Sequence, residues 1–401
     1  KPETTKPLLI LPVSRGAFFL FIFSRSVPGA ALSKALTPFS PSSWEKSSNI
    51  LFWNASLIPN AFPGGIDKVT LDAFTAIAVH SDMKRTGYLS CSNDSLNKLF
   101  SNIIWGQKGN FVDVPTDCPQ RDERLGWAGG KHYGDWLGLD APSGSYKGAS
   151  DETFIASAFY AYSTSLVIKA GNVLGEDVSE FEDLYTHIVK TFRSQYPVYH
   201  TQTECVLAAH FKLAENCQAA ADQLAEMITA CGNHLETGFV GTPYLLHVLS
   251  EYGHLKLAYT LLLREKYPSW LYPVTKGATT IWEHWDGIME DGNFWSSDMN
   301  SYNHYAYGSV ADWVYMVAAG INTVENAPGY EKILIAPHPD IRLDWLKAVL
   351  ETRHGKVTSE WKKEENFWRY EITTPVDTAI VIDGKNYQVK AGSYCFYSEQ
   401  K

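Results

Sequence analysis

Residues 150–166, SDETFIASAFYAYSTSL, carry the clearest helical signal in the chain. Apolar side chains recur there at intervals of three and four residues, which is the period of an amphipathic α-helix. They are Phe154, Ile155, Ala158, Phe159 and Tyr162. Acidic residues follow Ser150, and acidic side chains stabilise the first turn of a helix because they oppose its dipole. The stretch therefore predicts a helix that begins at about residue 150 and buries one face.

Similar signals occur on both sides of this stretch. The further predicted helices cover residues 92–106, 179–192, 216–232, 242–253, 255–264 and 305–319. Ser179 and Glu182 have the spacing of a capping box. Pro243 stands at a first helical position and Gly232 just after a helical end. Successive helices with short connections favour an α/α barrel or a solenoid, and the absence of a fixed-length repeat favours the closed barrel.

The sequence pattern changes outside the helical part. From about residue 322, short alternating runs and the hairpin signal Asp383-Gly384 predict a small antiparallel β-sandwich. Residues 67–91 also alternate as strands do, whereas no clear period marks residues 1–66. We therefore expect four parts: an atypical N-terminal segment (1–66), the remnant of a β-domain with a linker (67–91), a truncated helical domain (92–320) and a C-terminal β-sandwich (321–401).

Composition narrows the classes of function. A net charge of −10 without any basic cluster argues against a nucleic-acid partner. The six cysteines are far apart and show no metal-ligand spacing, so we expect no disulfide framework, no metal and no cofactor. Residues 16–23, GAFFLFIF, are too short to span a bilayer and resemble either a signal-peptide core or a buried strand. Free-looking cysteines lean towards a cytoplasmic location.

Two segments combine acidic residues with tryptophans. The first is residues 113–130, DVPTDCPQRDERLGWAGG, and the second is residues 277–308, which include IWEHWDG. Glycoside hydrolysis uses one carboxylic acid to protonate the leaving oxygen and one carboxylate to activate water or attack carbon. Tryptophans can carry a sugar ring and raise the pKa of an acid by excluding water. The alternatives are a surface ion-pair cluster at 113–130, a packed helix start at 282–285 and a structural role for His304.

Several motifs resemble the inverting α-L-rhamnosidases of the glycoside hydrolases (family 78). DVPTDCPQRDERLGW, SYKGASDETFIASAFYAYST, TGFVGTPYLL, GATTIWEHWDG, MNSYNHYAYGSVADW and ILIAPHPD occur in the order typical of that family and cover roughly residues 67–401. The resemblance implies an (α/α)6 barrel with β-sandwich domains around it. It implies a rhamnose-containing glycoside or polysaccharide as the substrate.

The resemblance also assigns roles to single residues. By motif, Glu123 corresponds to the general acid and Glu283 to the general base. Asp117 and Arg121 correspond to residues that bind rhamnose hydroxyls. Trp127 corresponds to a residue that packs against the sugar, and His304 to a residue that hydrogen-bonds it. Trp282, next to Glu283 in the acid-rich segment, is a further candidate for binding the substrate.

The chain departs from the family pattern just after Trp127. The family has an acidic residue where this chain has Gly130. The next sequence motif of the family follows about a hundred residues sooner in this chain than in the family. A barrel of six helix pairs needs twelve helices, and only seven or eight are predicted here. We therefore expect an incomplete (α/α)6-type barrel and impaired hydrolysis. Two alternatives remain: a non-catalytic carbohydrate-binding protein that uses Trp127, Trp282 and Trp285, and an α/α-barrel glycosidase with another sugar specificity.

Overall fold

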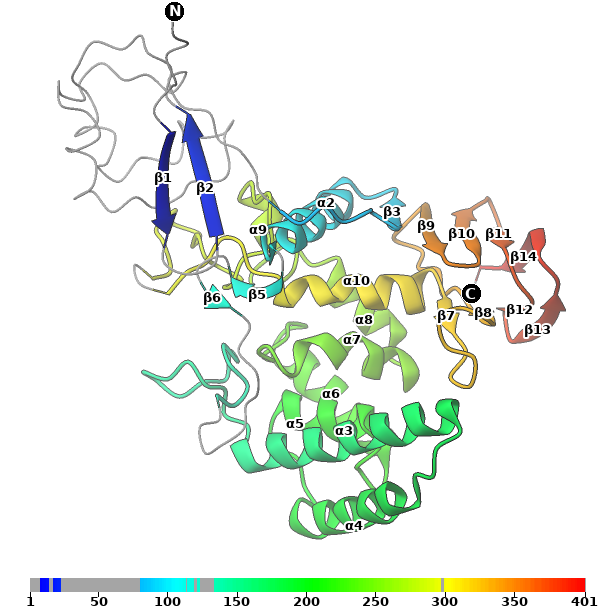
Figure 1. Cartoon of the computed structure of the whole chain (residues 1–401), viewed down its shortest axis with the longest axis horizontal. Helices are drawn as coiled ribbons and strands as arrows, with labels where there is room; N and C mark the ends of the chain where they lie inside the picture. The colour runs from blue at the N-terminus through cyan, green and yellow to red at the C-terminus, as the bar shows by residue number, and fades with distance from the viewer. Residues whose placement is uncertain are drawn as a thin grey trace, which may run out of the picture. The chain divides into compact units, whose positions relative to one another are not determined.

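The computed structural model describes residues 8–13, 17–22, 80–112, 114–118, 121–122, 133–296 and 299–400, with side chains for 80–111, 133–296 and 299–400. The chain divides into two compact units (Figure 1). Unit 1 comprises Lys1–Met83, Ser101–Arg124 and Lys276–Tyr305. Unit 2 comprises Lys84–Phe100, Leu125–Thr275 and Ala306–Lys401. Helices and strands are both abundant in the described residues, which agrees with the predicted mainly helical chain with β-structure.

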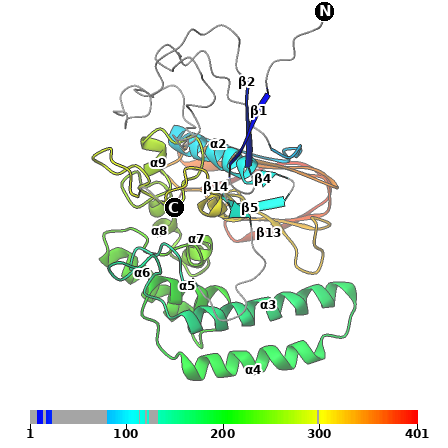
Figure 2. The same cartoon turned by 60° about the vertical axis from the view of Figure 1, so that its left-hand side comes forward.

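Helical hairpins make up much of unit 2. Helices pair as α3 with α4, α5 with α6, and α7 with α8, and the first members of the pairs also contact one another in order. Figures 1 and 2 both show α3 and α4 lying side by side. The bounds are α3 (Glu152–Leu174), α4 (Ser179–Gln195), α5 (Gln202–His210), α6 (Cys217–Ala230), α7 (Thr242–Glu251) and α8 (Leu255–Leu262).

The helical part of unit 2 ends in a mixed helical segment. The predicted helix over 305–319 is a 3₁₀ turn, an α-helical turn and a π-helical turn in succession. They are η4 (Ala306–Ser309), α10 (Val310–Trp313) and η5 (Val314–Ala318), and the short helix α9 (Tyr272–Thr275) precedes them. The indole N–H of Trp313 donates to Ser250 Oγ at 2.9 Å, which ties this segment to α7.

The helix ends confirm some predicted signals and correct others. Gly232 follows α6 with φ 79°, as expected of a residue just after a helix. The predicted capping box is wrong, because Ser179 is already inside α4 and its N-cap, Val178, makes no side-chain hydrogen bond. The N–H of Ser179 donates instead to Asp177 Oδ1 at 3.0 Å. The cap of α3 is Asp151, whose carboxylate accepts from the N–H of Phe154 at 2.7 Å.

Two sheets form the C-terminal part of unit 2. One has the strand order β14-β11-β10-β9-β3 and is antiparallel throughout. The other has the order β13-β12-β8-β7, in which β8 and β12 run parallel. The bounds are β3 (Gly87–Cys91), β7 (Ile321–Thr323), β8 (Ile333–Ile335), β9 (Trp345–Thr352), β10 (Gly355–Lys363), β11 (Phe367–Thr374), β12 (Thr378–Ile382), β13 (Lys385–Val389) and β14 (Gly392–Glu399).

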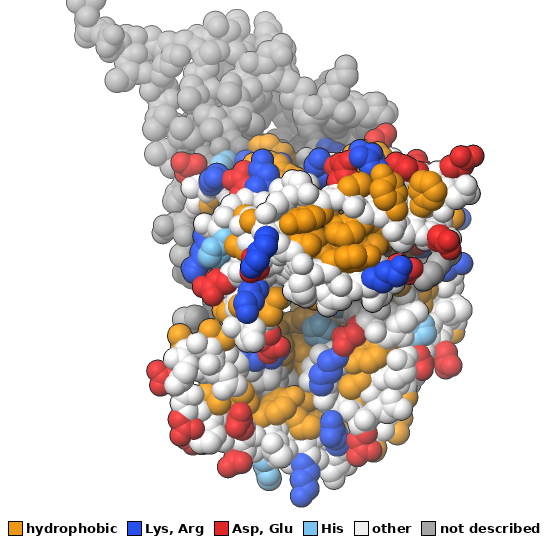
Figure 3. Space-filling model, turned by 90° about the vertical axis from the view of Figure 1, so that its right-hand side faces the viewer, with side chains coloured by type: hydrophobic (Ala, Val, Ile, Leu, Met, Phe, Trp, Pro, Cys, Tyr) orange, Lys and Arg blue, Asp and Glu red, His pale blue; other side chains and the backbone are white. Residues whose placement is uncertain are grey.

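The C-terminal sheets bury large apolar side chains. Trp361 is completely buried in β10, and its indole N–H donates to the carbonyl of Ala318 at 2.8 Å. The predicted turn is confirmed, since Ile382 pairs with Lys385 and both Asp383 and Gly384 have positive φ. Figure 3 shows hydrophobic side chains gathered on the surface over these strands.

Unit 1 contains the second part of α2 (Asp94–Gly109), whose first residues belong to unit 2. A small sheet of order β4-β5-β6 follows α2, and β1 pairs with β2. These strands are β1 (Leu8–Val13), β2 (Ala17–Ile22), β4 (Phe111–Val112), β5 (Val114–Cys118) and β6 (Arg121–Asp122). Within the described part of the chain, no helix is both long and apolar enough to cross a membrane.

Candidate functional site

The sequence-predicted site residues fall into two groups. Glu123 and Trp127 lie outside the described residues, as does Gly130. Asp117 belongs to β5 and Arg121 to β6, which are described by their backbone alone. The other three residues have described side chains and lie on neighbouring segments of unit 1. They are Trp282, Glu283 and His304.

Backbone hydrogen bonds join these neighbouring segments. The N–H of Glu283 donates to the carbonyl of Ser301 at 2.8 Å. The N–H of His304 donates to the carbonyl of Ile281 at 2.8 Å. The two bonds align residues 281–283 with residues 301–304, so the backbones of Trp282, Glu283 and His304 belong to two paired segments. Residues 281–287 form no helix, so the alternative of a helix start is wrong.

The second part of α2 supports this pair of segments. The side-chain amide of Asn102 donates to the carbonyl of Ala278 at 2.9 Å, and that of Asn110 donates to the carbonyl of Asn303 at 3.1 Å. Gly106 lies in α2, between Asn102 and Asn110, the residue that follows the helix. A Cβ atom at this position would be 3.2 Å from the carbonyl oxygen of His304. A glycine therefore lets the helix approach the backbone of the site closely.

Glu283 is the best-defined acidic residue of the site. Its side chain is 2% exposed, and its Oε2 atom accepts a hydrogen bond from the N–H of Ser301 at 2.9 Å. A bond of this kind constrains the direction of a carboxylate. Trp282 and Trp285, on either side in sequence, are also buried.

Aromatic side chains pack against one another along the same two segments. Trp282 meets Tyr302 edge to face, with ring centroids 5.1 Å apart. His284 stacks on Trp295 at 3.5 Å, and burial together with the charge of His304 lowers the pKa of His284 to about 3. His304 is 1% exposed. The segment thus combines a fixed carboxylate, a neutral histidine and aromatic side chains, a set that can accept a proton in a water-poor environment.

Metal chemistry finds no support in the described side chains. No group of three or more histidine, cysteine, aspartate or glutamate residues among them could hold a metal ion. The described cysteines are free, namely Cys91, Cys205, Cys217, Cys231 and Cys395.

A second polar centre, in unit 2, was missed by the sequence analysis. Asp135 is 1% exposed and accepts hydrogen bonds from the N–H groups of Gly238 at 2.7 Å and Val240 at 2.9 Å. The hydroxyl of Thr203 donates to the same carboxylate. The next residue, Trp136, packs against Tyr133 and Tyr146 with ring centroids 5.5 Å apart in each pair. The sequence GDWLG at residues 134–138 shows no pattern that would have predicted this centre.

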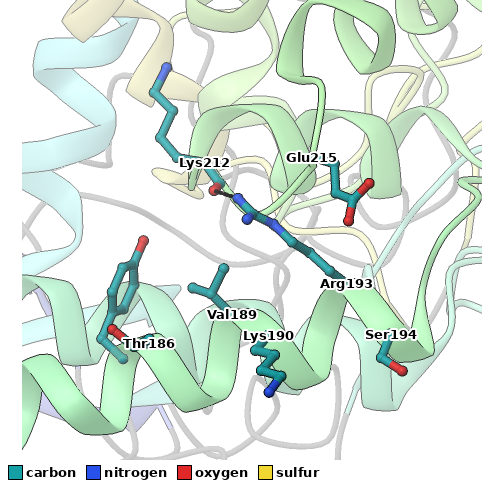
Figure 4. Close-up of a pocket in the computed structure, with 8 residues that line it drawn as sticks. Thr186, Val189, Lys190, Arg193, Ser194, Lys212 and Glu215 are labelled. Atoms are coloured by element: carbon teal, nitrogen blue, oxygen red, sulfur yellow. Dashed lines mark hydrogen bonds between the residues drawn. The ribbon is translucent and has the colours of Figure 1, made fainter.

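A cavity of about 520 Å³ lies beside α4, away from both groups in sequence. Residues of α4 line it together with Lys212 and Glu215. Figure 4 shows Arg193 extended towards the carbonyl of Lys212. The guanidinium also donates to the carbonyls of Leu213 and Ala214 at 2.9 and 3.3 Å. Because Arg193 satisfies backbone carbonyls, and because no predicted site residue lines the cavity, we assign it no catalytic role.

Two family models match the chain. The bacterial α-L-rhamnosidase 6 hairpin glycosidase domain matches residues 84–132 and 129–318. The bacterial α-L-rhamnosidase C-terminal domain matches residues 320–391. The first match is thus in two pieces that meet at residues 129–132 of this chain.

Curated relatives and solved structures agree with these matches. An α-L-rhamnosidase of Streptomyces avermitilis is 33% identical over 420 residues, covering 80% of this chain and 40% of the relative. One of Formosa agariphila is 32% identical, covering 77% and 45%. The crystal structure of the Streptomyces avermitilis α-L-rhamnosidase complexed with L-rhamnose has a TM-score of 0.73 at 29% identity, covering 82% and 43%.

The lengths of these matches show how much of each relative the chain covers. The chain spans less than half the length of each of these relatives. The alignment to the Streptomyces avermitilis relative is 420 positions long, whereas 80% of 401 residues is about 320, so about 100 of its positions have no residue in this chain. With the hairpin-domain model covering more than half of its residues, the chain belongs to the α-L-rhamnosidase family of 6 hairpin glycosidases.

Proposed function

We propose that this chain descends from an inverting α-L-rhamnosidase and acts on terminal, non-reducing α-L-rhamnose of a glycoside or polysaccharide. The observation that carries the proposal is the buried carboxylate of Glu283, which accepts a hydrogen bond from the N–H of Ser301 in a segment that also holds the buried Trp282 and Trp285. A carboxylate held in this way can take a proton from an attacking water. The family membership supports the same sugar.

The proposed mechanism needs a second carboxyl group. Glu123 is the proposed general acid that protonates the glycosidic oxygen, and Glu283 is the proposed general base. In an inverting enzyme the two carboxyl groups stand about 6.5–9.5 Å apart, which leaves room for the water between them and the sugar. Asp117 and Arg121 are proposed to bind rhamnose hydroxyls. Trp127 and Trp282 are proposed to pack against the ring, and His304 to hydrogen-bond it.

We further propose that the helical domain is an incomplete (α/α)6-type barrel and that hydrolysis is weak. The interruption of the family match at residues 129–132 supports this, as do the roughly 100 positions of the relative that this chain lacks. Gly130 stands where the family motif has an acidic residue. A catalytic site that lacks part of its supporting helices loses rate through misplacement of its acids, since an error of about 1 Å can cost a hundredfold.

Hydrolysis of an aryl α-L-rhamnoside by the purified chain tests this proposal. We expect slow turnover that Glu123→Gln and Glu283→Gln both abolish. Insertion of the missing stretch of the Streptomyces avermitilis relative between residues 129 and 133 should raise the rate. Fast turnover by the unaltered chain would overturn the proposed impairment, and fast turnover of another aryl glycoside alone would overturn the proposed sugar.

The same interruption favours one alternative, a protein that binds rhamnose without hydrolysing it. In that case Trp127, Trp282 and Trp285 would serve as a platform for the sugar. Calorimetry with L-rhamnose distinguishes the two: binding with no turnover, even at high protein concentration, supports the alternative. Measurable turnover that depends on Glu283 excludes it.

A further inference from the structure

Helix α3 has a long exposed face that carries little charge. Two of its 23 residues are charged, and both form ion pairs, Glu152 with Lys147 at 2.7 Å and Lys169 with Glu325 at 3.1 Å. Large apolar side chains are exposed along the same helix, namely Tyr160, Leu166, Val167, Val173 and Leu174. Leu174 is 75% exposed and Tyr160 is 52% exposed. The outer face of a surface helix ordinarily carries charged side chains, and an exposed apolar face of this size marks a contact with another molecule.

The spacing of the exposed residues suits the packing of a second helix. Exposed residues that are uncharged recur along one side of α3 at alternating intervals of four and three positions. They are Ala156, Tyr160, Ser163, Val167, Ala170 and Leu174. This is the spacing at which two helices remain in contact over several turns, with large side chains of one helix between those of the other.

Helix α3 also lies at the end of a row of helical hairpins. The first helices of successive hairpins contact one another, α3 with α5 and α5 with α7. Figures 1 and 2 both show the hairpin of α3 and α4 as the last in this row. The match to the hairpin-domain model is broken at residues 129–132, and α3 is the first described helix after the break.

This break indicates that the roughly 100 positions of the Streptomyces avermitilis relative without a residue in this chain precede α3. A hairpin formed by such positions would continue the row beside α3. Without it, a side of α3 that is suited to helix packing is left exposed to water.

We propose that the exposed face of α3 is a dimer interface and that its partner is the same face of a second copy of this chain. A symmetric dimer places one patch against itself, and this patch tolerates such a contact because the six residues that form it are uncharged. The two helices run antiparallel, since helix ends of opposite partial charge then lie together. The inference goes beyond the proposed function, because it holds whether or not the chain hydrolyses a rhamnoside.

The size of the face is sufficient for a specific dimer of modest affinity. Helix α3 has 23 residues, so it is about 35 Å long and, with its side chains, about 10 Å wide. Two such faces bury on the order of 1,000 Å² of accessible surface in total, which is the lower end of the range for specific interfaces. We therefore expect a Kd of about 1–10 μM for the dimer.

Sedimentation equilibrium at 1–100 μM protein, on the order of the expected Kd, tests the dimer. The unaltered chain should change from monomer to dimer over this range, and Val167→Glu and Leu174→Glu should each raise the Kd about 100-fold or more, because they bury a carboxylate in the interface. Ile341→Glu is the matched control, since Ile341 is an equally exposed apolar residue away from α3, in the segment before β9. Urea unfolding verifies that each variant is folded.

Disulfide crosslinking tests the direction of the two helices. Ser163 is the middle residue of α3, so in an antiparallel pair it faces its own copy, whereas Ala156 faces Ala170. Mild oxidation of Ser163→Cys should therefore give covalent dimers above the level of the unaltered chain. Ala156→Cys alone should not, because the two copies of that residue lie about 20 Å apart along the helices, beyond the reach of a disulfide of about 7 Å between Cα atoms.

The outcomes are distinct. A chain that carries the missing stretch of the Streptomyces avermitilis relative between residues 129 and 133 should be a monomer, because the added helices cover α3. An unaltered chain that remains a monomer at about 100 μM overturns the inference and assigns the face to a different protein. A dimer that Val167→Glu and Leu174→Glu leave intact overturns it as well, and crosslinking of Ala156→Cys alone as strong as that of Ser163→Cys overturns the antiparallel arrangement.

Discussion

The Oε2 atom of Glu283 accepts a hydrogen bond from the N–H of Ser301 at 2.9 Å, while the N–H of Glu283 donates to the carbonyl of Ser301 at 2.8 Å. The acid is thus held by its backbone and by its side chain to the same residue. The side chain of Glu283 is 2% exposed, so the hydrogen bond from Ser301 constrains a carboxylate that is almost completely buried. The geometry makes separate predictions for the stability and the activity of variants at this position.

Glu283→Gln should abolish hydrolysis but leave the fold nearly as stable as before. The amide oxygen of Gln can still accept from Ser301, so we expect a loss of about 1 kcal/mol or less in the free energy of unfolding. The rate should fall about 100-fold or more, since general-base catalysis contributes about 10²–10⁴. Glu283→Ala leaves a buried N–H without an acceptor and should cost about 2–4 kcal/mol. Urea unfolding with both variants measures the contrast, and an alanine variant as stable as the glutamine variant contradicts it.

His284 should make unit 1 sensitive to acid. Burial lowers its pKa to about 3 in the folded chain, well below the ordinary value of 6.5. The unfolded chain therefore binds a proton first, and the stability is complete above pH 6.5 and is lost as the pH falls below it. At pH 5 the loss from this group is about 2 kcal/mol. Urea unfolding between pH 7 and pH 5 measures it.

The variant His284→Phe keeps a ring against Trp295 and removes the titrating group. Its stability should change less between pH 7 and pH 5 than that of the unaltered chain. If His284→Phe retains the full pH dependence, another group is responsible for the acid sensitivity.

The sequence predicted helices well where one face is buried and one is exposed. The helix at 150–166 was confirmed and extends to Leu174. Helix α5 was not predicted, because all residues from Gln202 to Ala209 are buried and so show no helical alternation. The capping box failed at Ser179 because Asp177, two residues earlier, supplies the acceptor. Neighbouring residues can supply alternative hydrogen-bond acceptors at the start of a helix, and the sequence alone does not show which of them is used.

The candidate site was predictable only in part for a similar reason. The pairing of Glu283 with Ser301 joins residues 18 positions apart, and no periodicity marks it. Asp135 meets donors 68 to 106 positions away, so its burial follows from the tertiary fold and from the close approach at Gly238. Residue types and motif order indicated the chemistry of the site, whereas the partners that orient each side chain required the folded chain.

Ser250→Ala should loosen the contact between α7 and α10. The indole N–H of Trp313, a residue 1% exposed, donates to Ser250 Oγ at 2.9 Å. Removal of the acceptor leaves a buried donor unsatisfied, which costs about 1–3 kcal/mol. Ser163→Ala is the control, since that exposed hydroxyl donates only within its own helix, to the carbonyl of Tyr160. Equal stability of the two variants in urea would argue that water replaces the lost acceptor.

Substitutions at Gly320 and Gly384 can separate the cost of backbone strain from the cost of steric overlap by an added Cβ atom. Both have positive φ, 73° and 75°, which L-residues with a side chain adopt at a cost of about 1–2 kcal/mol. A Cβ atom on Gly384 would meet nothing within 4 Å, but one on Gly320 would lie 2.1 Å from the carbonyl carbon of Ala336. Gly384→Ala should therefore cost about 1–2 kcal/mol, and Gly320→Ala about 4 kcal/mol or more, because the backbone at Ala336, just after β8, must move. Urea unfolding measures the stability of both variants. Similar losses of stability would mean that the backbone before β7 accommodates a methyl group at no additional cost.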